Sequence, residues 1–272
     1  MAASAISYLF VPASRPDRYQ KALMAGADSV IIDLEDAVAL EDKDSSLAQL
    51  VEALESGLAE PVHVRINAAD TEWFERDLHM LAGLSAPGRA GLAGVFVPKV
   101  ENIASLERVR RALGDRGEVI ALIESAAGLS RLRELAGAPR LTRLGIGAAD
   151  LSFDLDVEIA SSTIDYVYAQ LVVESRLAGL LGPVASPPFS ISEAESTCAD
   201  ARRLRALGAT AQLAIHPAQL DPIHTGFRPN DEQVRWARRV VTSVGGAAQI
   251  DGQMVDKPVR ERAERILAQV DR

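Results

Sequence analysis

The stretch "RLGIGAADLSFDL", residues 143–155, decides how the fold is read. It begins as a buried strand would, with apolar residues and glycines, and then presents an acid, Asp150, where the strand is expected to stop. An acid at this place has two interpretations. Asp before an apolar turn is a common helix N-cap, and a strand-end carboxylate is also an oxygen ligand for a metal ion at the mouth of a barrel. Residues 143–155 alone do not choose between them.

Seven other short β-rich runs occur along the chain, and stretches with helical periodicity separate them. In the helical stretches apolar residues return at 3.6-residue spacing, and several of these stretches end in glycine, the usual C-terminal cap. Strands that alternate with helices predict a parallel sheet. The predicted strands cover residues 7–13, 29–35, 61–67, 94–100, 118–125, 143–150, 182–189 and 211–217, and the predicted helices cover residues 17–26, 46–57, 105–114, 164–179 and 193–208.

Eight is the number of parallel strands that closes a TIM (β/α)8 barrel, which we predict for residues 1–227. The alternative is a doubly wound open sheet, but its first strand is normally followed by a glycine-rich phosphate loop, and "LFVPASRPDR" (9–18) is not one. From about residue 228 the pattern changes to a helix with a capping start at Asn230, a glycine-rich loop and a closing amphipathic helix. Residues 228–272 are therefore predicted to form a C-terminal helical and loop extension that acts as a lid.

Composition narrows the class of protein. A net charge of −9 argues against a nucleic-acid partner, which would require basic patches. The single cysteine, Cys198, excludes a disulfide framework and suits a reducing cytosol. No signal peptide pattern and no apolar run of about 18 residues, the length needed to span a membrane, is present in the sequence. We therefore expect a cytoplasmic protein with no membrane partner.

The polar residues at the predicted strand ends give the main functional signal. Chemistry in a TIM barrel belongs at the C-terminal ends of the strands. Acids and cations gather at those ends, whereas the opposite ends are mostly Ser, Gly, Pro and Ala. The residues concerned are Arg15, Asp33, Glu35, Asp36, Arg65, Asn67, Lys99, Glu124, Asp150 and His216.

Glu124 and Asp150 end neighbouring predicted strands. Two carboxylates that close together repel each other unless a cation or a shared proton lies between them. Oxygen ligands of this kind suit Mg²⁺ or Mn²⁺, with open positions for water and substrate. The structural alternative is that Glu124 pairs with an arginine and Asp150 caps the next helical turn. The residues themselves leave both interpretations open.

Arg65, near the end of the third strand, is in a position to point into the barrel. A buried arginine needs an anionic partner, because an unpaired buried charge is very costly. The partner is expected to be a substrate carboxylate, a rim acid such as Glu35, or both. Asp33, Glu35 and Asp36 in "IIDLEDAV" cannot all be free anions in one small space, and we expect them to support Arg65 or the waters around a metal ion.

Lys99 raises the alternative of a Schiff base with a carbonyl substrate. We favour the simpler interpretation, in which Lys99 is a rim cation that meets phosphate or one of the acids.

The chain resembles the citrate lyase beta-subunit-like branch of the HpcH/HpaI aldolase superfamily from about residue 8 to residue 260. The motifs that carry the resemblance follow in the order typical of that branch. They are "YLFVPASRPDRYQKA", "VIIDLEDAVA", "VRINA", "VPKVE", "ALIESAAGL", "IHPAQL", "FRPNDEQVRWARRV" and "DGQMVDKPV".

This resemblance implies a TIM barrel with a C-terminal extension and carbon–carbon lyase chemistry that depends on Mg²⁺ or Mn²⁺, often on CoA thioesters such as malyl-, citramalyl- or citryl-CoA. It places the metal ligands at Glu124 and Asp150, which makes Glu124 a substrate-site residue as well. It implies a substrate-binding and catalytic role for Arg65. Asp256, in "QMVD", corresponds to an acid/base group delivered into a neighbouring subunit of a trimer or hexamer. Arg15 is the candidate for contact with CoA phosphates.

The chain departs from the family pattern at one position. Many members carry Glu where this chain has Ala149, so "GAADLSFDL" also resembles the "GPADLS" form of the 2-keto-acid aldolases. Asp150 itself is retained. Two alternatives therefore stay open, a metal-dependent aldolase acting on free hydroxy-keto acids and a non-catalytic subunit or scaffold homologue. Between the two interpretations of Asp150, a helix N-cap and a metal ligand, the resemblance favours the metal ligand.

Overall fold

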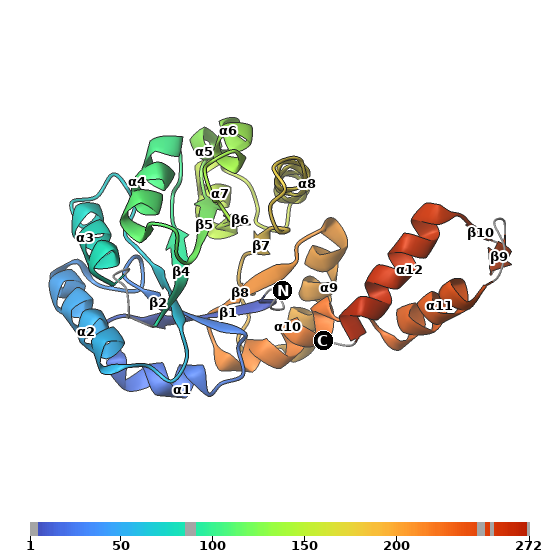
Figure 1. Cartoon of the computed structure of the whole chain (residues 1–272), viewed down its shortest axis with the longest axis horizontal. Coiled ribbons are helices and arrows are strands. Elements are labelled where there is room, and N and C mark those ends of the chain that lie inside the picture. Colours follow the sequence, from blue (N-terminus) through green and yellow to red (C-terminus); the bar gives the residue numbers. More distant parts are fainter. Residues whose placement is uncertain (1–4, 85–90, 244–247, 251–252, 271–272) are drawn as a thin grey trace.

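The protein is a closed eight-stranded barrel with a C-terminal extension. Figure 1 shows the extension projecting from one side of the barrel. The computed structural model describes residues 5–84, 91–243, 248–250 and 253–270. Each strand pairs in parallel with the next, and β8 pairs with β1 to close the barrel. The predicted TIM barrel is confirmed. The strands are β1 (Ser7–Pro12), β2 (Ser29–Asp33), β3 (Val62–Arg65), β4 (Leu92–Val97), β5 (Glu118–Ile123), β6 (Arg143–Ile146), β7 (Val184–Ala185) and β8 (Ala211–Ala214).

Helices cover the outside of the barrel, and no helix in the described part of the chain is long and apolar enough to cross a membrane. The α-helices of the barrel are α1 (Tyr19–Leu23), α2 (Lys43–Ser56), α3 (Phe74–Leu84), α4 (Ile103–Leu113), α5 (Ala126–Ser130), α6 (Leu132–Ala136), α7 (Ala148–Asp154), α8 (Ser162–Leu177), α9 (Ala194–Leu207) and α10 (Leu220–Phe227); the short 3-10 helices are η1 (Pro16–Arg18), η2 (Leu40–Asp42) and η3 (Pro217–Gln219).

Two apolar layers hold the barrel together, because strand residues alternate between its inside and its outside. The inward layer is a cluster of its own that includes Tyr8, Ile31 and Phe96, all at most 1% exposed. The outward residues of the strands pack against the helices in a second, larger cluster, of which Val64 and Leu50 are fully buried members. The inside of the barrel is thus a packed core rather than a pore.

Because of the same alternation, charged side chains also point into the barrel at the C-terminal ends of the strands. Asp33 lies two residues after the inward-facing Ile31, and Arg65 lies two residues after His63, whose ring contacts Tyr8 edge-on. Asp33 and Arg65 are also register partners on β2 and β3. Strand period and register together therefore place an acid beside an arginine at the C-terminal mouth.

All eight strands end earlier than the sequence indicated, and the difference is largest for β6 and β7. β6 stops at Ile146 rather than at residue 150, and Asp150 lies in the first turn of α7. A short run of small apolar residues fits a strand and a buried helix equally well, and here Ala148 and Leu151 are buried as helical residues. β7 is only two residues long, because the prolines that follow have no N–H to donate to a neighbouring strand.

The extension consists of α11 (Asp231–Thr242), β9 (Ala248–Ile250), β10 (Gln253–Val255) and α12 (Lys257–Val270). The predicted capping start is confirmed, since the side chain of Asn230 accepts a hydrogen bond from the backbone N–H of Gln233. The prediction of a loop was wrong in part, because β9 and β10 pair as an antiparallel hairpin.

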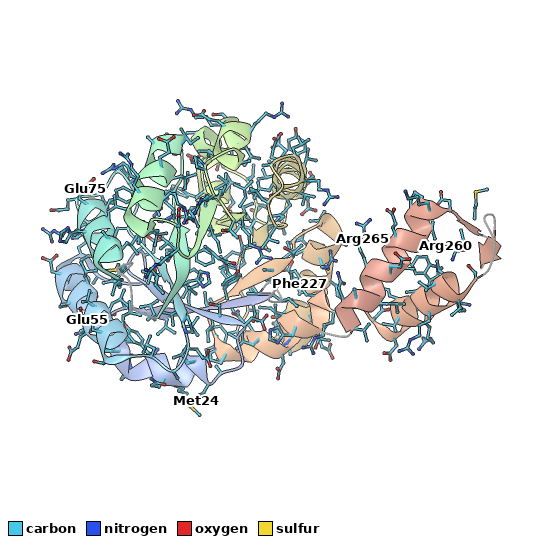
Figure 2. The ribbon with its side chains drawn as sticks, viewed as in Figure 1. Met24, Glu55, Glu75, Phe227, Arg260 and Arg265 are labelled. Atoms are coloured by element: carbon cyan, nitrogen blue, oxygen red, sulfur yellow. The ribbon has the colours of Figure 1, made fainter. Side chains whose placement is uncertain are left out.

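The extension packs mainly on itself. Its small core includes Val240, Val255 and Ala263. In Figures 1 and 2, α11 and α12 project away from the barrel from a junction near Phe227, and the hairpin lies at the far end. The hairpin is therefore remote from the barrel of its own chain.

Gly94 tests the close packing of the strands. A Cβ at this position would lie 2.6 Å from the backbone oxygen of Glu118 on the neighbouring strand. We expect Gly94→Ala to destabilise the protein by about 1–3 kcal/mol, because the backbone of β5 must move. Gly83→Ala is the matched control, since no described atom lies within 4 Å of its added Cβ and alanine favours the α3 helix. Urea unfolding that finds the two variants equally stable would contradict this view of the barrel.

Candidate active site

Arg65 is the centre of the charged cluster at the mouth of the barrel. Its Nε donates to Asp33 Oδ1 and its Nη2 donates to Asp33 Oδ2, both at 2.7 Å. Asp33 is 1% exposed and also accepts hydrogen bonds from the backbone N–H groups of Glu35 and Ala37. Burial works against the charge on Arg65, but Asp33 and Glu35 outweigh it and hold the pKa of Arg65 above its usual value. The arginine is therefore a fixed, permanent cation.

Glu35 joins Arg65 to Lys99. Its Oε1 accepts a hydrogen bond of 2.7 Å from Lys99 Nζ, and its Oε2 lies 3.1 Å from Arg65 Nη1. Lys99 Nζ also donates to Asp36 at 3.2 Å. Burial lowers the pKa of Lys99, but Glu35 and Asp36 outweigh burial and raise it above its usual value. A firmly protonated amine is a poor Schiff-base nucleophile, so the structure agrees with a rim cation that meets the acids.

Glu124 follows β5 and is 4% exposed. Its Oε2 accepts a hydrogen bond of 2.8 Å from the backbone N–H of Lys99. Lys99 has a φ of 48°, in the left-handed region that costs energy for a residue with a side chain. Burial raises the pKa of Glu124 to about 7, and the nearby charges of Glu35 and Asp150 act in the same direction. Glu124 is thus an acid that lacks a full counter-charge.

Asp150 lies in the first turn of α7, close enough to Glu124 to act on it electrostatically. Gly147 leaves room for the Glu124 carboxylate, because a Cβ at that position would lie 2.3 Å from Glu124 Oε1. Gly147 also occupies the N-cap position of α7, so the interpretation of Asp150 as the helix N-cap is wrong. The Asp150 side chain is exposed and has no hydrogen-bond partner among residues 5–84, 91–243, 248–250 and 253–270.

The two carboxylates fit a small, hard divalent cation. They offer only oxygen donors, and besides burial and Glu35 the negative charge of Asp150 adds to the raised pKa of Glu124, as expected for neighbouring like charges. In the part of the chain that the structure describes, no group of three or more His, Cys, Asp or Glu side chains forms a fuller metal cage. Two protein ligands leave further positions for water and substrate, which is the usual arrangement around Mg²⁺.

Arg15 and Asp256 lie outside this cluster. Arg15 is half-exposed and forms a two-pronged pair with Asp17, at 2.9 and 2.8 Å. Asp256 is exposed directly after β10, and it accepts a hydrogen bond of 3.1 Å from the backbone N–H of Val259 in the first turn of α12. Neither residue contacts the barrel cluster in this arrangement, and their roles stay predictions.

Ser186 is a residue of the site that sequence reasoning missed. Its hydroxyl donates to the backbone oxygen of Ile146 and accepts from the backbone N–H of Ala148, both at 2.7 Å. Ser186 thereby fixes the turn between β6 and α7 that carries Asp150. Nothing in the sequence marks it, because the serine lies in an ordinary strand-like run.

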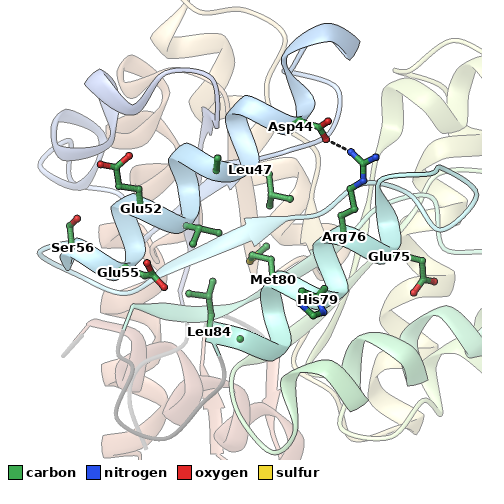
Figure 3. A pocket seen from close by; sticks show the side chains of 13 residues that line it. Asp44, Leu47, Glu52, Glu55, Ser56, Glu75, Arg76, His79, Met80 and Leu84 are labelled. Atoms are coloured by element: carbon green, nitrogen blue, oxygen red, sulfur yellow. Dashed lines mark hydrogen bonds and ion pairs between the residues drawn. The ribbon is translucent and has the colours of Figure 1, made fainter.

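A surface groove lies elsewhere, between α2 and α3, with a volume of about 1000 Å³. Figure 3 shows Leu47, Met80 and Leu84 along it, with Glu52 and Glu55 at its edge. None of the residues that line this groove belongs to the charged cluster at the barrel mouth.

The barrel and its charged mouth define a TIM-barrel enzyme that works at the C-terminal ends of its strands. The sequence model of the HpcH/HpaI aldolase/citrate lyase family matches residues 7–217. The chain belongs to this family, and it is a carbon–carbon lyase by family membership.

Relatives match over nearly the full length of the chain. A citrate lyase subunit beta-like protein of Deinococcus radiodurans is 32% identical over 280 residues, covering 96% of each chain. The L-malyl-CoA/beta-methylmalyl-CoA lyase of Cereibacter sphaeroides is 31% identical and covers 97% of this chain and 93% of its own. The CitE protein of Mycobacterium tuberculosis, solved in complex with magnesium, acetoacetate and coenzyme A, superposes with a TM-score of 0.86 at 33% identity and covers 100% of both chains.

The raised pKa of Glu124 predicts a pH-dependent effect on stability in metal-free buffer. The folded protein keeps a proton on Glu124 up to about pH 7, whereas an unfolded glutamic acid releases it near pH 4.5. The folded state thus binds more protons in this window, and this group's contribution to the free energy of unfolding falls as pH rises through it. The Glu124→Gln variant has no carboxyl group at this position, so its free energy of unfolding does not fall in this way.

We therefore expect Glu124→Gln to gain stability relative to the wild type by on the order of 1–3 kcal/mol between about pH 4.5 and about pH 8. Urea unfolding of both proteins in EDTA measures the difference. A difference that stays constant over the whole window would show that the pKa of Glu124 is ordinary.

Proposed function

We propose that the chain is a Mg²⁺-dependent lyase that cleaves, or forms, a 3-hydroxyacyl-CoA thioester such as malyl-, citramalyl- or citryl-CoA, giving an acyl-CoA and an oxo acid. The observation that carries the proposal is the pair Glu124 and Asp150 beside the permanent cation Arg65. Family membership and the bound magnesium and coenzyme A of the similar CitE structure support it. The single cysteine suits a cytoplasmic setting.

Glu124 and Asp150 are the residues that would hold the Mg²⁺ or Mn²⁺ ion. A bound divalent cation supplies Lewis acidity and a template for the oxygens of an oxo acid. Glu124 is pre-oriented for this task by the backbone N–H of Lys99, and Gly147 leaves space for its carboxylate. A carboxyl group must be ionised to bind a metal, so protons compete with the metal at Glu124 below about pH 7.

Arg65 provides the positive charge that the reaction needs. In a retro-aldol or Claisen-type cleavage, negative charge develops on the enolate oxygen as the carbon–carbon bond breaks. Asp33 and Glu35 hold the guanidinium rigidly, so little reorganisation is needed when that charge appears. Arg65 also neutralises a substrate carboxylate in the same position.

Asp256 is the proposed general acid/base, which moves the proton between the substrate hydroxyl or the enolate carbon and its own carboxylate. We propose that it acts on a neighbouring subunit of a homo-oligomer, a trimer or hexamer. The support is that β9 and β10 lie at the far end of the extension, away from their own barrel (Figure 1). Arg15 is proposed to contact CoA phosphates by exchanging its exposed partner Asp17.

The function is tested by assaying the isolated protein with Mg²⁺ on malyl-, citramalyl-, 3-hydroxy-3-methylglutaryl- and citryl-CoA, alongside free 4-hydroxy-2-keto acids. We expect cleavage of at least one CoA thioester, loss of that activity in EDTA and its return with added Mg²⁺. Turnover of the free acids alone would instead establish a 2-keto-acid aldolase. An inactive homomer with intact metal binding would point to a subunit that needs other partners.

The shared site is tested by mixing two inactive variants, Asp256→Ala and Glu124→Gln. Mixed oligomers combine an intact barrel from one subunit with an intact extension from another, so part of the activity should return. The control is a mixture of each variant with itself, which should stay inactive. If subunit exchange is verified by mass and the mixture remains inactive, Asp256 either serves its own barrel or has no catalytic role.

A further inference from the structure

A buried polar network lies behind the charged cluster, between the loops that follow β2 and β3. Lys43, the first residue of α2, is 7% exposed. Its Nζ donates to the backbone oxygens of Leu34 and Glu35, at 2.6 and 2.7 Å, and to Asn67 Oδ1 at 2.7 Å. All three protons of the ammonium group therefore have acceptors.

Asn67 links this lysine to a buried acid. Its backbone N–H and its Nδ2 both donate to Asp77 Oδ2, at 2.7 and 2.9 Å, while its Oδ1 accepts from Lys43. Asn67 is 3% exposed and Asp77, in the first turns of α3, is 1% exposed. The asparagine amide thus bridges a buried cation and a buried carboxyl group, and each end fixes its orientation.

The place of Lys43 is unfavourable for stability by itself. The N-terminus of a helix carries partial positive charge, which disfavours a cation in its first turn. Burial further penalises the ammonium group, and it lowers the pKa of Lys43 despite the acids nearby. Residues that oppose local preferences in this way are commonly kept at functional sites.

The contacts of Lys43 show what the lysine controls. It binds the two peptide carbonyls on either side of the Cα of Glu35, and so sets the direction in which the Glu35 side chain leaves the chain. Through Asn67 it also fixes the chain two residues beyond Arg65. Glu35 in turn lies between Arg65 and Lys99.

We propose that Lys43 is a positioning residue of the site, which acts through the backbone of Leu34 and Glu35 to hold the Glu35 carboxylate against Arg65 and Lys99. Asp77 holds the side-chain amide of Asn67, and so fixes Asn67 Oδ1, the third acceptor of the lysine. For its kinetic part the inference rests on the lyase activity proposed above, and its structural part is measurable without any activity.

The structural test uses hydrogen–deuterium exchange. The amides of Glu35 and Ala37 are protected by Asp33, and that of Leu34 by the backbone oxygen of Arg65. Lys43→Met keeps the length of the side chain and removes its charge, so peptides covering residues 33–37 and 65–68 should exchange at least about tenfold faster. Leu50→Ala, a fully buried position on the same helix, is the matched control and should loosen α2 without this effect.

The kinetic test is a double-mutant cycle with Glu35→Gln. If Lys43 acts through Glu35, Lys43→Met should lower kcat about ten- to a hundredfold in the wild type but at most about twofold in the Glu35→Gln background. A merely structural lysine would lower kcat by the same factor in both backgrounds, which would overturn the proposal. Far-UV circular dichroism and the unfolding midpoint of every variant ensure that folded protein is compared.

A second variant covers the case in which Lys43→Met does not fold. Asn67→Ser removes the side-chain amide that accepts from Lys43 and donates to Asp77, while the lysine and the backbone N–H of residue 67 that donates to Asp77 stay in place. It should therefore reproduce the faster exchange at residues 33–37 to a smaller extent. Unchanged exchange there in the folded variants would overturn the proposal. If the wild type cleaves no CoA thioester, the proposed function fails on its own, and the exchange data still decide the role of Lys43.

Discussion

A guanidinium group inside the mouth of the barrel is the constraint on which the site depends. Arg65 cannot be buried without anions, because an unpaired charge in a protein interior is very costly. The strand register supplies Asp33 as its two-pronged partner, and the loop after β2 supplies Glu35. The Glu35 carboxylate in turn is paired with the ammonium group of Lys99. One largely enclosed cation therefore organises the acids of the loop after β2 and, through Glu35, the side chain of Lys99.

The same network explains why Glu124 remains available. The cations of the cluster are paired with Asp33, Glu35 and Asp36, and among the described residues the Glu124 carboxylate accepts a hydrogen bond only from the backbone N–H of Lys99. Burial raises the pKa of Glu124, and Glu35 and Asp150 raise it further. Asp150, in the first turn of α7, adds a second carboxylate close enough to act on Glu124 electrostatically. An excess of carboxylate at the mouth of a barrel is unfavourable for the protein alone and favourable once a divalent cation is bound. The site is thus arranged for a partner carrying positive charge.

Much of the barrel was predictable from sequence, because eight strand-like runs alternating with helices have few closed solutions. The acids and cations at the C-terminal ends of the strands were also predicted, because the end of each strand-like run can be recognised in the sequence. The position of Asp150 on a helix was not, because "GIGAAD" suits a strand and a buried helix alike. Contacts between distant segments, such as those of Lys43 with Asn67 or of Ser186 with Ile146, have no local signature and require coordinates. The hairpin of β9 and β10 was missed because its glycines are typical of loops.

The central claim is that Glu124 and Asp150 together hold the divalent cation. The most direct measurement is an anomalous difference map from crystals of the protein grown with Mn²⁺, which replaces Mg²⁺ at oxygen sites. We expect one strong peak within about 2.0–2.4 Å of a carboxylate oxygen from each residue, beside Arg65. A saturated crystal with its peak elsewhere, or with a cation bound by only one of the two carboxylates, would contradict the claim.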